Sequence, residues 1–145
     1  MIRIAAAALM LASGAMAVLA QGDVIAERKK TMKANGAATE AGAAMAKGQA
    51  PFDLAKAQGI FRTYQEAART MPGLFPENSK TGGDTSAAPR IWEDMAGFRA
   101  GFAKFEKEAA EAAAATKDLA SFRAGFAIVT KNCGACHEKY RIKKS

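Results

Sequence analysis

Residues 119–140 read LASFRAGFAIVTKNCGACHEKY and carry the clearest pattern in this chain of 145 residues. Their apolar residues lie alternately three and four positions apart: Leu119, Phe122, Phe126, Val129, Cys133, Cys136 and Tyr140. This spacing indicates one face of an α-helix, and an unbroken series of such steps is typical of helices packed at shallow angles in a bundle. We therefore expect a helix over about 117–143 whose buried face includes both cysteines.

The same segment contains a C-x-x-C-H motif formed by Cys133, Cys136 and His137. This motif is the attachment signature of a covalent c-type haem. Cysteines three residues apart share one helix face, so both sulfurs can reach the vinyl groups of one porphyrin, and the adjacent imidazole can bind the iron as proximal ligand. The chain has no other cysteine or histidine. We expect one haem c, attached through both thiols, and no disulfide.

Two other chemistries are open to a C-x-x-C pair, a redox-active dithiol and half of a zinc site. A tetrahedral zinc site needs four ligands, and the three strong ligands here are clustered too tightly to close one. A thioredoxin-like dithiol belongs at the start of a helix in a βαβ unit, which the sequence does not indicate. The dithiol is the main alternative to haem attachment.

Three further segments have helical periodicity, over about 23–47, 52–70 and 90–115. The last two carry apolar faces formed by Leu54, Ala57, Phe61, Tyr64, Ala68 and Met71, and by Ile91, Met95, Phe98, Phe102, Phe105, Ala109 and Ala112. Asp23 and Thr116 are the expected caps that open the first and the fourth helix. The sequence thus predicts an all-α protein, an antiparallel four-helix bundle with haem bound within the bundle near its end.

The connections between these helices differ in length. Residues 47–51 are short enough for a turn, whereas residues 72–89 are rich in Gly, Ser, Thr and Pro and longer than a usual bundle connection. We expect this longer stretch to be either a plain surface loop or a cover over a haem edge.

The N-terminus has the features of a secretory signal peptide. Arg3 supplies the positive charge, residues 4–11 supply a short apolar stretch, and Val18-Leu19-Ala20 provides small residues for cleavage before Gln21, with Ala15-Met16-Ala17 as an alternative cut. An uncleaved membrane anchor is the competing interpretation, but Ser13 and Gly14 interrupt the run. We expect residues 1–20 to be a signal peptide and residues 21–145 to form one haem domain, exported to the periplasm without stable membrane insertion.

The chain is basic, with 21 Lys and Arg against 14 Asp and Glu and a formal charge of +7. Loss of Arg3 with the signal leaves +6. Nucleic acid is an unsuitable partner because no stripe of interleaved aromatic and basic residues is present and the chain is expected to be exported. The positive charge favours an acidic redox protein as partner.

The C-x-x-C-H motif near the C-terminus of a four-helix chain resembles the class II cytochromes c, the cytochrome c′ family. The likeness covers the whole region after the signal peptide. Besides CGACHEKYR at 133–141, it includes ERKKTMKANG at 27–36, LFP at 74–76 and PRIW at 89–92. The haem motif is highly specific, and the other stretches support it.

The resemblance implies a role for Met32, which lies four residues after Arg28. In the family this position points at the sixth coordination site of the iron. Members with a non-ligating residue there are five-coordinate, high-spin and bind small gases, whereas a smaller branch has methionine and is low-spin. The resemblance therefore places Met32 as the distal ligand. An ordinary core methionine is the alternative, and Met45, Met71 and Met95 are weaker ligand candidates.

The resemblance also suggests haem contacts for two arginines, Arg28 at a propionate and Arg141 at the proximal imidazole or the haem edge. An exposed, solvated arginine is the alternative in each case. Homodimers are common in the family, so a second copy of the chain is a further expected partner.

Together these features predict an electron carrier, not an enzyme, with His137 and Met32 as axial ligands and Cys133 and Cys136 as anchors. The alternative is a five-coordinate, high-spin protein that binds gases such as nitric oxide or carbon monoxide. A peroxidase or a nitric-oxide-consuming enzyme is less favoured, because a peroxidase normally uses a distal histidine and the chain has only His137.

Overall fold

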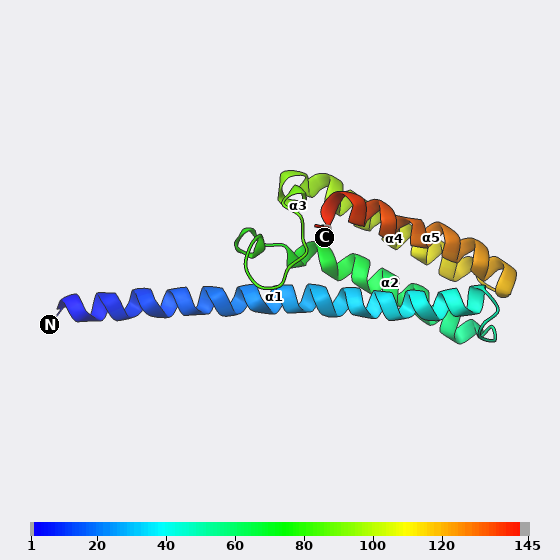
Figure 1. Ribbon diagram of the computed structural model, residues 1–145, viewed down its shortest axis with the longest axis horizontal. Coiled ribbons are helices and arrows are strands. Elements are labelled where there is room, and N and C mark those ends of the chain that lie inside the picture. The colour runs from blue at the N-terminus through cyan, green and yellow to red at the C-terminus, as the bar shows by residue number, and fades with distance from the viewer. Residues whose placement is uncertain (1, 143–145) are drawn as a thin grey trace.

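Four long helices lie side by side in the computed structural model, which describes the backbone of residues 2–142 and the side chains of residues 24–142 (Figure 1). The elements are α1 (Ile2–Ala46), α2 (Leu54–Thr70), the 3-10 turns η1 (Met71–Leu74) and η2 (Glu77–Ser79), α3 (Arg90–Glu93), α4 (Met95–Ala115) and α5 (Leu119–Tyr140). Around the bundle, α1 packs on α2, α2 on α4, α4 on α5, and α5 on α1. The chain reverses direction between successive long helices (Figure 1). The predicted all-α, antiparallel four-helix bundle is confirmed.

The core is aromatic and follows the seams expected from the sequence. Phe61, Tyr64 and Phe122 are fully buried, and the rings of Phe61 and Phe122 contact each other across the bundle with centroids 5.7 Å apart. The remaining buried aromatics are Phe75, Phe98, Phe102, Phe105, Phe126 and Tyr140. Trp92 is only half-buried, and its indole N–H donates to the Phe75 carbonyl at 3.0 Å.

Two glycines allow the helices to approach closely. A Cβ at Gly42 on α1 would lie 2.4 Å from the Phe126 ring on α5, and a Cβ at Gly125 on α5 would lie 2.8 Å from the Ala112 Cβ on α4. These contacts bring α5 against both neighbouring helices. The position of the helix that carries the C-x-x-C-H motif is therefore fixed by close packing.

Carboxylates that cap helices explain where the observed boundaries differ from the expected ones. Asp118, not Thr116, opens α5 through a capping box with Ser121. Thr116 instead ends α4, and its hydroxyl donates to the Ala112 carbonyl at 2.7 Å. Asp23 does not open the first helix, because the backbone of α1 is already helical from Ile2.

The third expected helix is divided in two. Asp94 leaves the helical conformation (φ −132°, ψ 52°) and its side chain accepts the Gly97 N–H at 3.1 Å, so it opens α4 as an N-cap. The four residues before it form the short α3. At the second helix the prediction was off by two residues, because Asp53 caps α2 by accepting the Lys56 N–H at 3.0 Å. The short connection at 47–51 contains Gly48 at φ +73°, a conformation that favours glycine.

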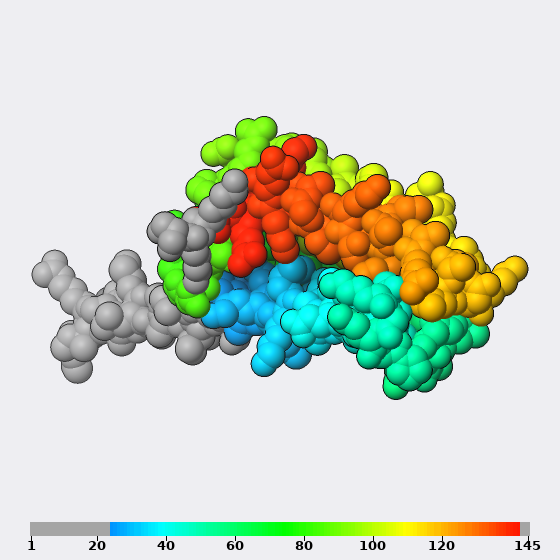
Figure 2. All heavy atoms as spheres, turned by 45° about the vertical axis from the view of Figure 1, so that its right-hand side comes forward, coloured from blue at the N-terminus to red at the C-terminus, as the bar shows by residue number. Residues whose placement is uncertain are grey.

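The long connection, residues 71–89, is tied to the bundle at several points, and we call it the strap. Phe75 and Ser79 within it are buried. Near its end the strap pairs with the end of α5, where the Ala88 N–H donates to the Tyr140 carbonyl and the Ile142 N–H to the Ser86 carbonyl. Figure 2 shows the strap (green) beside the last turn of α5 (red) at one end of the bundle. The strap is therefore a packed element, not a plain surface loop.

Within the described part of the chain, no helix is long and apolar enough to cross a membrane.

The close approach at Gly125 predicts a measurable cost for one added methyl group. Gly125→Ala should destabilise the holoprotein by about 1–2 kcal/mol, because overpacking against Ala112 outweighs the better helix propensity of alanine. The control is Gly101→Ala on α4, where nothing lies within 4 Å of the added Cβ. This variant should be stabilised by up to about 1 kcal/mol. Chemical unfolding measures both, and equal stability of the two variants would contradict the packing argument.

Candidate haem site

The two cysteines lie half-buried on the bundle-facing side of α5, and both are free thiols. Burial raises the pKa of the Cys133 thiol and of the Cys136 thiol. Both groups are therefore neutral thiols at neutral pH. Cys136 packs against the hydrophobic core, as the periodicity predicts. The structure thus presents two thiols from one helix face to the interior of the bundle.

His137 follows the cysteines on α5 and is the most exposed of the three motif residues. Partial burial of the ring lowers the pKa of His137, and the positive charge of Arg141 lowers it further. The imidazole is therefore neutral at pH 7, and a neutral imidazole is the form that binds a metal.

Met32 lies on α1, the helix that packs directly against α5. Its side chain is half-buried and contacts the same core that Cys136 contacts. Of the weaker ligand candidates, Met45 and Met71 are buried in that core, 3% and 4% exposed. Met95 is half-buried on α4, which is not among the principal neighbours of α1. Of the two methionines on α1 whose side chains the structure describes, Met45 is buried in the core and Met32 is only half-buried.

Tyr64 adds a polar group to this interior that the sequence pattern assigned only to packing. It is fully buried on α2, and its hydroxyl is 2.8 Å from the Thr39 hydroxyl on α1. Burial raises the pKa of Tyr64 to about 12, and the Thr39 hydrogen bond opposes the shift. In the sequence, the only sign of the hydrogen bond between Tyr64 and Thr39 was a tyrosine in an otherwise apolar series.

Arg28 is buried at the strap end of α1, only 5% exposed. Its Nε donates to the Leu74 carbonyl at 2.6 Å, and its terminal nitrogens donate to the Ser79 carbonyl at 3.3 Å and to the Ser79 hydroxyl. The solvated alternative considered for this arginine is therefore wrong. Three of its five N–H groups are used by the strap, and the expected propionate contact stays a prediction.

Arg141 has a backbone role in the structure. It follows the last residue of α5, its N–H donates to the His137 carbonyl at 3.3 Å, and it pairs with Ala87 of the strap. Its side chain is exposed. Burial is the main cause of the lowered pKa of His137 and the positive charge of Arg141 adds to it, and a contact with the haem edge stays a prediction.

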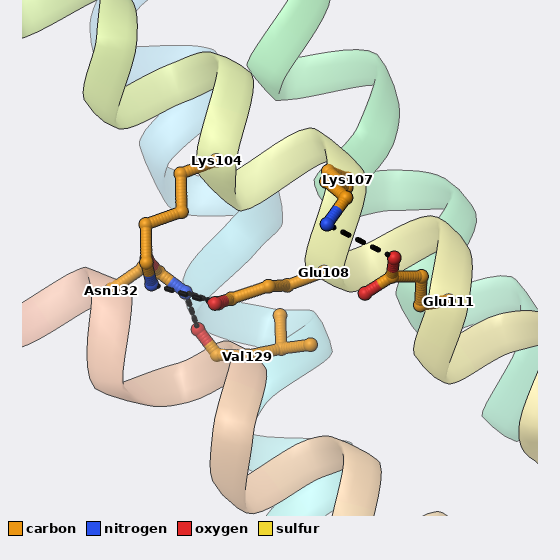
Figure 3. A network of polar contacts seen from close by, with 6 residues as sticks. All are labelled: Lys104, Lys107, Glu108, Glu111, Val129 and Asn132. Carbon is orange, nitrogen blue, oxygen red and sulfur yellow. Dashed lines mark hydrogen bonds and ion pairs between the residues drawn. The ribbon is translucent and has the colours of Figure 1, made fainter.

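A polar network holds α5 in place one residue before Cys133. The Asn132 amide donates to Glu108 Oε2 at 2.6 Å and to the Val129 carbonyl at 2.9 Å, while Lys104 Nζ donates to Asn132 Oδ1 at 3.0 Å. Figure 3 shows these side chains meeting between α4 and α5. Lys104 also forms an ion pair with Glu108 at 2.7 Å. The network joins α4 to α5 beside the motif, and no pattern in the sequence predicted it.

The outer surface between α1 and α2 forms a groove of about 650 Å³. It is lined by charges of both signs, including Glu27, Lys30, Arg62 and Glu66. Asn35 lies in the groove, and its buried Oδ1 has no hydrogen-bond partner among the described residues. Nothing in the structure shows a second copy here, and the expected homodimer stays a prediction.

These donors fit a c-type haem and do not fit zinc. Two neutral thiols share one helix face, a neutral imidazole adjoins them, and a thioether lies on the facing helix. Among the residues with described side chains, no three His, Cys, Asp or Glu side chains are grouped so as to hold a metal ion. The donor set therefore matches covalent attachment to a porphyrin with imidazole and thioether as possible axial ligands.

Residues 23–141 match the sequence model of the family described as Cytochrome C′. The chain belongs to this family. It is 45% identical to a cytochrome c′ of Rhodopseudomonas palustris over 99% of both chains, and 34% identical to a cytochrome c-556 of the same organism over 97% of this chain and 96% of that one. The solved structure of R. palustris cytochrome c′ superposes with a TM-score of 0.82 at 47% identity, covering 85% of this chain and 98% of that one.

Membership establishes the cofactor and the general role. The protein is an electron-transport haem protein of class II that carries covalently attached haem c with its iron. The two named relatives are a cytochrome c′ and a cytochrome c-556, and neither name indicates an enzyme. The dithiol alternative for the C-x-x-C pair is thereby set aside.

Proposed function

We propose that this cytochrome is an exported one-electron carrier, attached to its haem by Cys133 and Cys136, with His137 and Met32 as axial ligands. The observation that carries the proposal is the placement of Met32. It is the half-buried one of the two methionines on α1 with described side chains, and α1 packs against the helix that bears the thiols and the imidazole. A side chain in that place could supply a second ligand to a haem held by α5.

The ligand pair suits electron transfer. Haem iron supplies the one-electron chemistry, and a thioether, a soft neutral ligand, favours the ferrous state and raises the reduction potential. The chain contributes rigidity, because the Asn132 network holds α5 and core packing holds α1. Two fixed ligands keep the structural change on electron transfer small and hinder other ligands from reaching the iron.

The alternative is a high-spin protein in which Met32 packs without binding and the iron takes up a small gas. One observation favours it: the chain is more similar to a relative named cytochrome c′ than to one named cytochrome c-556, 45% against 34% identical. Overall sequence identity reflects residues throughout the bundle, whereas binding of the iron on its sixth site depends on one side chain. We therefore give more weight to Met32 itself.

The spectrum of the purified holoprotein and of Met32→Leu tests the ligand. We expect a low-spin spectrum that carbon monoxide leaves unchanged, and in Met32→Leu a high-spin spectrum that shifts with the gas. Leucine preserves the packing volume, so a change reports the lost sulfur. Met95→Leu is the control and should keep the low-spin spectrum. A low-spin spectrum retained in Met32→Leu would eliminate Met32 as ligand.

Export is proposed from the first twenty residues. The family match begins at residue 23, just after the expected cut before Gln21, so the segment before it lies outside the part of the chain that matches the family. Removal of residues 1–20 on export to the periplasm, where c-type haem is attached, accounts for this arrangement.

The intact mass of the exported protein tests cleavage and attachment together. We expect a chain that begins at Gln21 and carries one haem that denaturation does not release. In the double variant Cys133→Ala/Cys136→Ala, the cut should be unchanged and the covalent haem absent. A mass that includes residues 1–20 would contradict the cleavage, and covalent haem in the double variant would contradict the anchors.

The proposed redox partner is acidic, and the surface beside the motif supports this. Lys139 and Arg141 are exposed at the end of α5, and neither side chain has an ion-pair partner within the described region. Such charges speed encounter with a negatively charged surface. Lys143 and Lys144, which extend the basic tail in the sequence, lie outside the described residues.

Electron transfer from an acidic flavodoxin, used as a surrogate donor, tests this surface. The second-order rate should fall about tenfold between low and physiological ionic strength, and about threefold in Lys139→Gln at low salt. Lys117→Gln removes an exposed charge just before the other end of α5 and should leave the rate nearly unchanged. Equal effects of the two substitutions would show that net charge alone, not this surface, attracts the donor.

A further inference from the structure

Arg28 carries a buried charge with no opposite charge beside it. The acceptors of its three hydrogen bonds, the Leu74 and Ser79 carbonyls and the Ser79 hydroxyl, are all neutral. Among the residues whose side chains are described, no carboxylate forms an ion pair with it. Burial lowers the pKa of Arg28 to about 10, so the guanidinium remains charged at neutral pH. A buried arginine usually has a carboxylate or phosphate partner, so this arrangement calls for a reason.

The strap is shaped to hold this charge. Ser79 is completely buried, and its hydroxyl both accepts from Arg28 and donates to the Pro76 carbonyl at 2.7 Å. The guanidinium carbon lies 4.1 Å from the centre of the Phe75 ring and 5.8 Å from that of Trp92. The negative faces of these rings stabilise a cation without neutralising it. The site therefore keeps a full positive charge out of water.

The charge lies at the end of the bundle that holds the proposed axial ligands. Arg28 is one helical turn before Met32 on α1. On the other side, the Phe75 ring contacts Phe98 at 4.8 Å, and Phe98 contacts Tyr140 at 5.2 Å. Tyr140 is one turn after His137 on α5. The packed aromatic side chains between these points leave a medium of low polarity, in which charges act over longer distances than in water.

We infer that the buried charge of Arg28 raises the reduction potential of the haem. When the iron accepts an electron from a redox protein, the site loses one positive charge, and a fixed cation nearby favours that less positive, reduced state. No bond changes and no proton moves in this step. The inference rests on the proposed electron-carrier function, because it concerns the driving force of that transfer. A haem propionate paired with Arg28 would leave the direction unchanged, since removal of the cation would then expose an unbalanced anion.

Two substitutions separate the charge from the hydrogen bonds. Arg28→Gln removes the charge and the forked donor, whereas Arg28→Lys keeps the charge and removes the fork. Lys33→Gln is the matched control, because Lys33 is exposed and follows Met32 directly on the same helix. The equilibrium constant for reduction of each holoprotein by a redox mediator is measured at pH 6, where a lysine at this site keeps its proton. Hydrogen exchange of the strap amides is measured in parallel.

Arg28→Gln should lower the equilibrium constant for reduction about tenfold, because a charge in a medium of low polarity acts over a longer distance than in water. Arg28→Lys should lower it less than threefold, and Lys33→Gln less than twofold because water screens an exposed charge. Exchange in the strap should rise similarly in both Arg28 variants, since both lose the fork. The reduction potential would then depend on the charge at position 28, whereas hydrogen exchange of the strap amides would depend on the hydrogen bonds.

Equal losses in Arg28→Gln and Arg28→Lys would overturn the inference, because the effect would then come from the loosened strap. An unchanged constant in Arg28→Gln would overturn it as well. A change of spin state in Arg28→Gln alone would show that Arg28 acts by placing Met32, which also contradicts an electrostatic role. The proposed electron-carrier function fails separately, if the wild-type spectrum is high-spin and responds to carbon monoxide.

Discussion

The packing of one face of α5 against α1 and α4 is the constraint on which the rest of this structure depends. The residues on that face are spaced for a helix seam, and the two cysteines occupy two places in the same series. Any fold that buries Phe122, Phe126 and Val129 must also turn both thiols inward. Under the proposed attachment, the haem would therefore be held by the core of the bundle, in a place set by how closely α5 meets its neighbours. The contacts of Gly42 with Phe126 and of Gly125 with Ala112 set that closeness.

Most of the fold was accessible from the sequence because it depends on periodicity, which a single chain displays directly. The four helices and their core faces follow from steps of three and four residues, and the all-α bundle is the outcome that those steps allow. The boundaries were less accessible, because capping is a competition between nearby polar residues. Thr116 and Asp118 both suit a cap, and only the structure shows that Asp118 begins α5 while Thr116 ends α4. The apolar series over 90–115 looks continuous in the sequence, but Asp94 divides it into α3 and α4.

The candidate site likewise has a part that the sequence reveals and a part that it does not. The haem motif was evident because its chemistry lies in consecutive residues of one helix. The surroundings of Arg28 were not, since its partners Leu74 and Ser79 are 46 and 51 residues away in the chain and leave no periodic signal. The Asn132–Glu108 contact, between two helices, was missed for the same reason. Long-range polar contacts depend on how elements are placed in space, and that placement is a property of the fold rather than of any segment.

The junction between the strap and the end of α5 has a consequence for how the sequence can vary. It is formed by main-chain groups, with the N–H groups of Ala88 and Ile142 donating to the carbonyls of Tyr140 and Ser86. No side chain takes part in these two bonds, so most substitutions at 86, 88 and 142 leave them intact. Proline is the exception at 88 and 142, because it has no N–H to donate. The closure of this edge of the molecule therefore depends on the main chain and not on the identity of the side chains that donate or accept there.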